Sequence, residues 1–107
     1  MSKGSDASAE GEQEHSFTRE LGLTHTEFYR SLPPAIAPRA FTRENDRVQI
    51  DLEPGTVTIE LGPQKQRSIA SLRLPYVEVR FTFSGLSIAQ RQAFMERFEI
   101  HFHRGGG

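Results

Sequence analysis

The feature that most constrains this chain is a hydrophobic alternation with a period of two residues, which runs from Val48 to Phe83. Large apolar side chains occupy every second position in three segments of it, Val48–Leu52, Val57–Leu61 and Val77–Phe83. Because successive side chains of a β-strand point to opposite faces, each segment predicts a strand with one buried face and one solvated face. The pattern therefore favours an antiparallel sheet with a single apolar side.

Short turn sequences separate these segments, so consecutive strands are expected to be neighbours in the sheet. Asn45–Asp46 tolerates a left-handed backbone and predicts a tight turn between Ala40–Glu44 and the strand that begins at Arg47. Glu53–Thr56, which contains a Pro-Gly pair, predicts the next turn, and residues 62–65 predict a third.

The number of strands depends on Pro75, which follows a further alternating run, Ala70, Leu72 and Leu74. Proline has no amide hydrogen to donate to a neighbouring strand, so Pro75 marks either a tight turn or a kink at a sheet edge. We favour the turn, which gives five strands. Four strands, one of them bent at Pro75, is the alternative. In both cases the sheet is an antiparallel meander.

Two capping boxes predict one helix before the sheet and one after it. The first box is Thr24–Glu27, and its short helix is expected to end before Pro33–Pro34, because the residue before a proline disfavours the helical backbone. The second box, Ser87–Gln90, begins a long helix for which Gly105 is the expected C′ residue. The apolar side chains of the long helix recur every three or four positions, in a stripe that consists of Ile88, Ala89, Phe94, Met95, Phe98 and Phe102.

Together these elements predict an α+β fold, a two-layer sandwich in which a short N-terminal helix and a long C-terminal helix cover one face of the meander. The single domain is expected to span residues 21–104. The segment 1–20 carries Lys3 and Arg19 against five carboxylates and has few large apolar side chains, which predicts a disordered acidic tail. The glycines at 105–107 are expected to form a flexible end.

Composition excludes several classes of site. The chain has no cysteine, so it has no disulfide, thiolate-bound metal, iron–sulfur cluster or cysteine nucleophile. A formal net charge of −1 gives no concentrated basic footprint, so binding to nucleic acid is not favoured. No apolar run approaches the roughly 20 residues of a membrane span, and residues 1–22 lack a secretory apolar core. We therefore expect a cytoplasmic protein that does not enter membranes.

No combination of residue types predicts a catalytic centre, a cofactor site or a metal centre. His101 and His103 lie two positions apart, about 200° around a helix, so they cannot bind one metal ion together within that helix. The carboxylates of Asp51 and Glu53 are expected on the solvated face of the sheet. No cleft is expected there that would shift their pKa values apart, as a general acid and a general base require. Enzyme activity is therefore the less favoured expectation.

The candidate binding residues are basic and aromatic side chains. They are Arg73, Tyr76, Arg80, Arg91, Arg97, His101 and Arg104. Arg73, Tyr76 and Arg80 are expected around the exposed face of the sheet. Arg97, His101 and Arg104 follow a helical spacing of four and then three residues, which predicts a column on the outer side of the last helix. Arg91 contributes to the same column.

Three functions remain open from the sequence. The leading hypothesis is a non-enzymatic binding or accessory module that contacts other proteins through the open sheet face, an edge strand or the tail, as a monomer or a weak homodimer. The second is a small-molecule-binding protein or enzyme with a pocket between sheet and helices, lined by Tyr29 together with Tyr76, Arg73 and Arg80. The third is weak binding of nucleic acid through the arginines.

Overall fold

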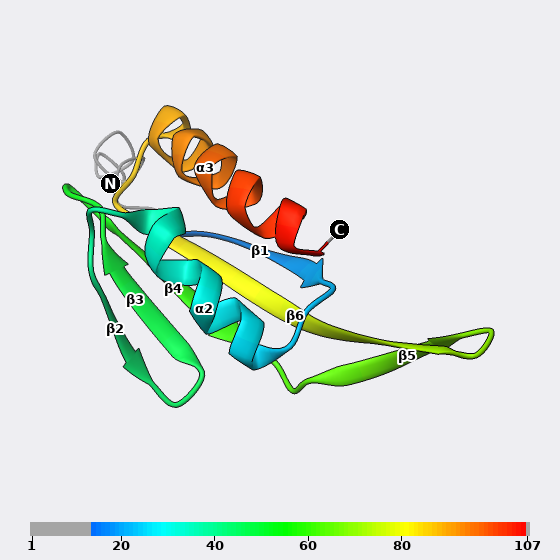
Figure 1. The fold of residues 1–107 in the computed structure, drawn as a ribbon. Helices are drawn as coiled ribbons and strands as arrows, with labels where there is room; N and C mark the ends of the chain where they lie inside the picture. The colour runs from blue at the N-terminus through cyan, green and yellow to red at the C-terminus, as the bar shows by residue number, and fades with distance from the viewer. Residues whose placement is uncertain (1–13, 107) are drawn as a thin grey trace, which may run out of the picture.

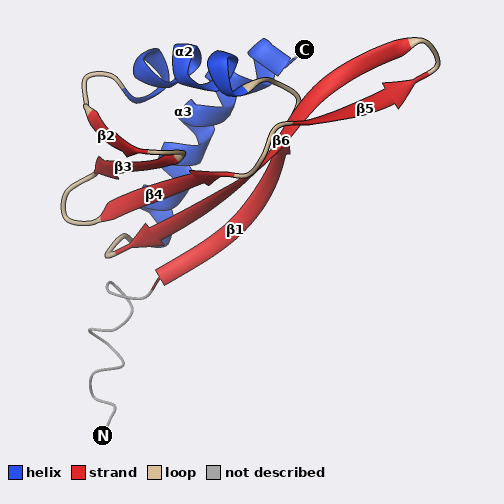
Figure 2. Cartoon of the chain, turned by 90° about the horizontal axis from the view of Figure 1, so that it is seen from below, coloured by secondary structure: helices blue, strands red, loops and turns tan. Residues whose placement is uncertain are grey.

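The computed structural model describes residues 14–106 of the chain and has one antiparallel sheet with two helices on one of its faces (Figures 1 and 2). The predicted α+β, two-layer arrangement is confirmed. The elements in chain order are β1 (Glu14–Leu21), α2 (His25–Ile36), β2 (Phe41–Glu44), β3 (Arg47–Asp51), β4 (Thr56–Leu61), β5 (Lys65–Ile69), β6 (Leu72–Ser84) and α3 (Ile88–Gly106).

The sheet keeps the predicted antiparallel succession of β2, β3, β4 and β6 and adds two strands that were not predicted, β1 at its edge and β5 beside the first half of β6. Its order is β1-β6-β4-β3-β2, and every pairing is antiparallel. β6 is the long strand of the molecule. Its second half lies between β1 and β4, whereas its first half, Leu72–Tyr76, pairs only with β5 and leaves the body of the sheet (Figure 2).

The hydrophobic core lies between the sheet and the two helices. The alternating residues of β3, β4 and β6 face it as predicted, and none is more than 1% exposed: Val48, Ile50, Val57, Ile59, Val77, Val79, Phe81 and Phe83. From the helices, Phe98 meets Phe81 edge to face with ring centroids 5.0 Å apart, and Phe102 stacks on Phe98 at 4.0 Å. Phe28 of α2 packs against Phe102 at 5.1 Å, so one aromatic cluster joins both helices to β6.

Both predicted capping boxes are present. The Glu27 amide donates to the Thr24 hydroxyl at 3.1 Å, and the Thr24 amide donates to the Glu27 carboxylate at 2.9 Å. At the start of α3 the same exchange joins Ser87 and Gln90, with distances of 2.8 and 3.2 Å. The tight turn between β2 and β3 is also as predicted, with Asn45 in the left-handed region at a φ of 57°.

The segment predicted as a disordered tail is corrected at residues 14–20, because these residues belong to β1. They pair along their full length with Val77–Ser84 of β6. The composition of β1 is polar, but Phe17 stacks on Phe81 with ring centroids 5.2 Å apart, and Leu21 packs against the same core. This packing and the hydrogen bonds to β6 stabilise a strand that its own sequence pattern does not predict. Residues 1–13 lie outside the described part of the chain.

The turn predicted at Pro75 is wrong. Pro75 lies inside β6, opposite Gln66 of β5, and the chain reverses at Ala70–Ser71 instead. Ala70 adopts a φ of 56°, which permits this reversal without a glycine. The expected strand through Ala70, Leu72 and Leu74 is therefore divided between a turn and the first residues of β6.

Both helices extend further than predicted. Pro33 and Pro34 lie inside α2, which continues to Ile36 because its last residues, Ala35 and Ile36, are buried in the core. α3 continues through Gly105 to Gly106, so the expected flexible end is helical at 105 and 106, while residue 107 lies outside the described range. None of the helices in the described part of the chain is long and apolar enough to cross a membrane.

Candidate interaction surface

The most distinctive surface of the molecule is the projecting β-hairpin Lys65–Tyr76, here called the hairpin arm. It consists of β5 and the first five residues of β6, which pair from Lys65 opposite Tyr76 to Ile69 opposite Leu72. Figures 1 and 2 show that it extends past the ends of the helices and the other strands. Within residues 14–106, β5 pairs with β6 alone.

The position of the apolar residues along β6 explains why the hairpin arm lies outside the core. Val77 and Val79 occupy odd positions and face the helices, whereas Leu72 and Leu74 occupy even positions of the same continuous strand. Since side chains alternate between faces, the two leucines point to the side that carries no helices.

Three large aliphatic side chains of the hairpin arm are exposed to solvent. Ile69 is 51% exposed, Leu72 60% and Leu74 43%, and Ile69 lies directly opposite Leu72 next to the turn. Among the described residues the other exposed large hydrophobic side chains are Ile88 and Ile100, which are separate positions on α3. The apolar tip, Ile69–Leu72–Leu74, is thus a cluster of adjacent exposed aliphatic side chains at one end of the molecule.

All charged side chains of the hairpin arm are basic. They are Lys65, Arg67 and Arg73, and the sequence has no Asp or Glu between Leu61 and Glu78. The Arg67 guanidinium lies 4.4 Å from the centre of the Tyr76 ring and 3.0 Å from the carboxylate of Glu20 on β1. No other acidic side chain of the described region pairs with the arm, so Lys65 and Arg73 keep their charge uncompensated there.

The predicted site residues on the sheet are only partly brought together. Tyr76 and Arg80 lie on the same face of β6, the face without helices. Arg73 lies on the opposite face of the strand, opposite Ser68. Arg80 lies between Thr18 of β1 and Glu60 of β4, in the polar body of the sheet. Tyr76 and Arg73 therefore belong to the arm, and Arg80 does not.

The predicted column on α3 also divides. Arg91 donates to the Leu86 carbonyl at 3.3 Å and lines a hollow between α3 and β1. Arg97 lies six residues further, about 120° away around the helix, and lines a hollow on the side of α2. His101 stays with Arg97, since its Nδ1 is 3.1 Å from the Arg97 carbonyl oxygen. The side chain of Arg104 lies outside the described part of the structure.

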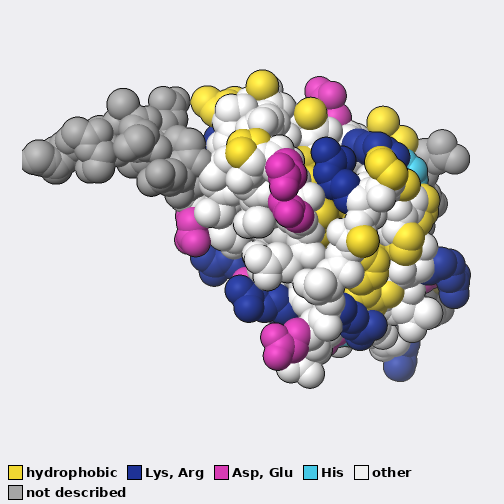
Figure 3. All heavy atoms as spheres, turned by 90° about the vertical axis from the view of Figure 1, so that its left-hand side faces the viewer, with side chains coloured by type: hydrophobic (Ala, Val, Ile, Leu, Met, Phe, Trp, Pro, Cys, Tyr) yellow, Lys and Arg dark blue, Asp and Glu magenta, His cyan; other side chains and the backbone are white. Residues whose placement is uncertain are grey.

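The end of the molecule opposite the arm has a different surface. There the hollow that Arg97 lines also includes Arg39 and Glu53 around an apolar floor. Seen from that end, side chains of both charges border a band of hydrophobic side chains (Figure 3).

A cluster of ionisable side chains joins the start of α2 to the β2–β3 turn. Asp46 accepts a hydrogen bond from the Tyr29 hydroxyl at 3.3 Å and lies 3.6 Å from the Arg43 guanidinium, which stacks over the Tyr29 ring at 3.6 Å. The Nε2 of His25 is 2.8 Å from the Gly62 carbonyl, and its Nδ1 is 3.8 Å from Asp46. Burial raises the pKa of the Tyr29 hydroxyl; nearby Arg43 opposes this shift and Asp46 adds to it. Each group already has a partner within the cluster, so we interpret the cluster as a structural link between α2 and the β2–β3 turn.

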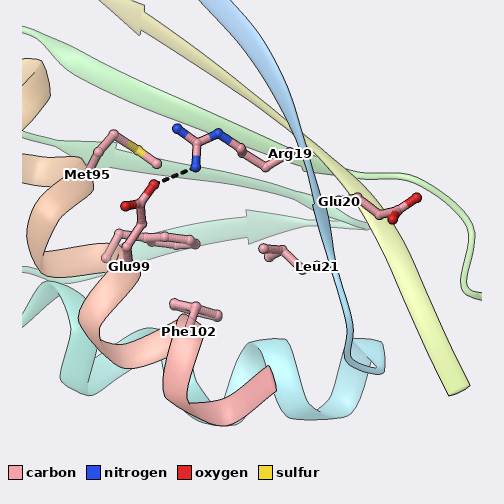
Figure 4. Close-up of a pocket in the computed structure, with 7 residues that line it drawn as sticks. Arg19, Glu20, Leu21, Met95, Glu99 and Phe102 are labelled. Atoms are coloured by element: carbon pink, nitrogen blue, oxygen red, sulfur yellow. Dashed lines mark hydrogen bonds and ion pairs between the residues drawn. The ribbon is translucent and has the colours of Figure 1, made fainter. Parts of the chain in front are cut away.

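The pocket expected between sheet and helices is not formed by its predicted lining. The interior is filled by Phe28, Phe81, Phe83 and Phe98, none more than 2% exposed. Of the predicted lining residues, Tyr29 belongs to the Asp46 cluster and the others lie on the arm or on β6. A second hollow between β1 and α3, lined by Leu21 and Phe102, is a surface groove, and the ion pair of Arg19 with Glu99 crosses it (Figure 4). Among the described side chains, no group of three His, Cys, Asp or Glu is placed to hold a metal ion.

Sequence reasoning named Arg73 and Tyr76 but missed Lys65, Arg67 and the apolar tip. One signal in the sequence points to them, which is the change of the apolar positions from even to odd numbers between Leu74 and Val77. No protein-family model matches the chain, and no curated protein and no solved structure shows significant similarity to it. The hairpin arm is therefore identified from its own geometry and chemistry.

Proposed function

We propose that the protein is a non-enzymatic module that binds another protein through its hairpin arm. The observation that carries this proposal is the joint presence of three adjacent exposed aliphatic side chains and an exclusively basic set of charges on one projecting hairpin. The proposal keeps the leading hypothesis from the sequence and assigns it to a surface.

The apolar tip supports binding because its exposure is unfavourable in the free protein. Burial of one aliphatic side chain of this size in an interface contributes about 1.5–3 kcal/mol, or about tenfold or more in affinity. Ile69 and Leu72 are adjacent across the turn, so a single shallow cleft of a partner accommodates both.

The charges of the hairpin arm define the chemistry of the partner. Lys65 lies opposite Tyr76 at the base of the arm, on the face of the apolar tip, and Arg73 lies between Leu72 and Leu74 on the other face. A partner surface with an apolar cleft bordered by Asp or Glu complements both features, and the basic charges accelerate association with such a surface. The expected partner is therefore an acidic protein.

The test is quantitative affinity capture with the full chain from native cell extract after nuclease treatment. We compare the wild type with the double variant Ile69→Ser/Leu72→Ser and with Ile100→Ser, which removes an equally exposed aliphatic side chain from α3. Proteins that the wild type and Ile100→Ser retain should fall by about tenfold or more with the double variant. A second variant, Lys65→Gln/Arg73→Gln, should weaken retention mainly at low salt.

Three results contradict the proposal. Captured proteins that are unchanged by the double variant show that the hairpin arm is not the contact surface. An equal loss with Ile100→Ser shows that general hydrophobicity governs retention. Proteins that are captured from a parallel untreated extract but lost after nuclease treatment assign the basic charges of the arm to nucleic acid instead.

A further inference from the structure

The second surface that remains without a partner is the outer edge of β1. β1 is the outermost strand on its side of the sheet and pairs only with β6 in the described region. It is eight residues long, whereas β2 at the opposite edge has four. A long edge strand presents a row of unpaired backbone amides and carbonyls, and proteins commonly cover such an edge or keep it short.

The helix layer stops short of this edge. Phe17 of β1 stacks on Phe81 and Phe83, with ring centroids 5.2 and 5.9 Å apart, yet it stays only partly buried. The groove beside it is lined by Met95 and by Ile88, which is 57% exposed. Figure 4 shows the adjoining part of the groove, where Arg19 and Leu21 of β1 face Glu99 and Phe102 of α3. Backbone groups and apolar side chains are thus left uncovered along the same strand.

We propose that β1 pairs antiparallel with β1 of a second copy of this chain, so that two sheets form one continuous sheet. A two-fold axis normal to the sheet places opposite residues of the two copies on the same face of the joined sheet. Because side chains alternate between faces, opposite residues must both have even numbers or both have odd numbers. Two registers of this kind leave only one residue of each β1 unpaired. In the first, residues 14–20 of the two copies pair, with residue 14 opposite residue 20. In the second, residues 15–21 of the two copies pair, with residue 15 opposite residue 21.

The charges of β1 select the second register. Pairing 14–20 places the carboxylates of Glu14 and Glu20 opposite each other twice, which is unfavourable. Pairing 15–21 places Thr18 opposite the second copy's Thr18 and Phe17 opposite its Arg19, without like charges in register. The arginine-on-phenylalanine contact is one that the chain already makes internally, since the Arg19 guanidinium lies 5.2 Å from the centre of its own Phe17 ring.

This arrangement explains why the groove remains open in the single chain. Because both helix layers lie on the same side of the joined sheet, α3 of the second copy approaches the groove from the other side. Its Ile88 and Met95 are then available to cover the half-buried Phe17. Because β1 is complementary to itself in this register, a second copy of the chain is favoured as the partner over an unrelated extended peptide.

The test is sedimentation velocity of the full chain over two decades of concentration into the high micromolar range. The wild type should approach twice the monomer mass of 12.1 kDa. Thr18→Lys places two ammonium groups opposite each other at the axis and should weaken dimerisation about fivefold or more. The matched control is Thr42→Lys, an equally solvent-facing position on the opposite edge strand β2, which should leave dimerisation unchanged.

Cross-linking tests the register separately. The chain has no cysteine, so Thr18→Cys introduces a single thiol that lies opposite its own copy in the proposed register. It should form an intermolecular disulfide under mild oxidation much faster than Ser16→Cys, which shares its face and exposure. A wild type that stays monomeric, equal cross-linking at both positions, or a dimer that Thr18→Lys leaves intact and Ile69→Ser/Leu72→Ser abolishes would each overturn the proposal.

Discussion

The body of the molecule and the hairpin arm use the same alternation of aliphatic residues with opposite results. Val77 and Val79 are fully buried, whereas Leu72 and Leu74, on the same strand β6, are 60% and 43% exposed. The difference is that both helices lie over the body, on the face to which the valines point. A period of two residues therefore predicts a strand, but burial requires a second layer on the correct face.

This difference separates the part of the chain that stabilises the fold from the surface that we propose binds a partner. The core between helices and sheet supplies the apolar burial that stabilises the fold, and its aromatic cluster links three elements through Phe28, Phe81 and Phe98. The hairpin arm contributes little to that core and is therefore available for contact with another protein. Substitutions in the two regions should accordingly change different properties.

The largest expected effect is from Phe98→Asp in the body. Phe98 is 2% exposed among four aromatic neighbours, so the substitution places an unpaired carboxylate in the core. We expect a loss of more than about 4 kcal/mol in the free energy of unfolding and no cooperative thermal transition. The measurement is thermal denaturation followed by circular dichroism.

The matched variant for the arm is Leu72→Asp, which introduces the same charge at an exposed position. Its free energy of unfolding should stay within about 0.5 kcal/mol of the wild type. If Leu72→Asp also abolished the transition, the arm would be part of the stabilising core and the distinction between the two regions would fail.

The capping boxes and the three buried strands were predictable because their signals are local. Thr24 with Glu27 and Ser87 with Gln90 are read within four residues, and the alternation that ends at Phe83 lies within single strands. The prolines of α2 were not predictable in this way. Their helix-breaking preference is outweighed by burial of Ala35 and Ile36, which depends on contacts far along the chain.

The edge strand and the hairpin arm were missed for a related reason. In β1 only Phe17 and Leu21 are large and apolar, and their partners on β6 lie more than fifty positions away in the sequence. The turn at Ala70–Ser71 contains no Gly, Pro, Asn or Asp, whereas Pro75 lies inside a strand. Consequently the sequence named Arg73 and Tyr76 as binding residues without the hairpin that presents them.

A smaller effect is expected from Arg67→Ala, which removes the contact between the arm and β1. Arg67 pairs with Glu20 and lies over Tyr76, but its side chain is 48% exposed, so each interaction contributes about 0.5–1 kcal/mol at most. We expect amide hydrogen exchange within the arm to accelerate about two- to fivefold, with unchanged exchange in the body. Arg47→Ala, which removes a similarly exposed ion pair with Glu60 from the body, should leave exchange in the arm unchanged. Uniform acceleration in both regions after Arg67→Ala would show that they unfold as one unit.

The smallest effect concerns alkaline pH and the hydroxyl of Tyr29 in the body. Burial raises the pKa of the Tyr29 hydroxyl above its ordinary value of 10.0, so the folded state favours the neutral phenol. The stabilisation that follows is complete below pH 10 and is lost as the pH rises through the raised pKa.

At neutral pH, Tyr29→Phe should lower the free energy of unfolding by about 0.5 kcal/mol, since it removes the hydrogen bond to Asp46. Chemical denaturation should then show that this deficit shrinks above pH 10, because phenylalanine has no proton to lose. A deficit that stays constant across that range would contradict the prediction, because it would mean that ionisation of Tyr29 is not coupled to folding.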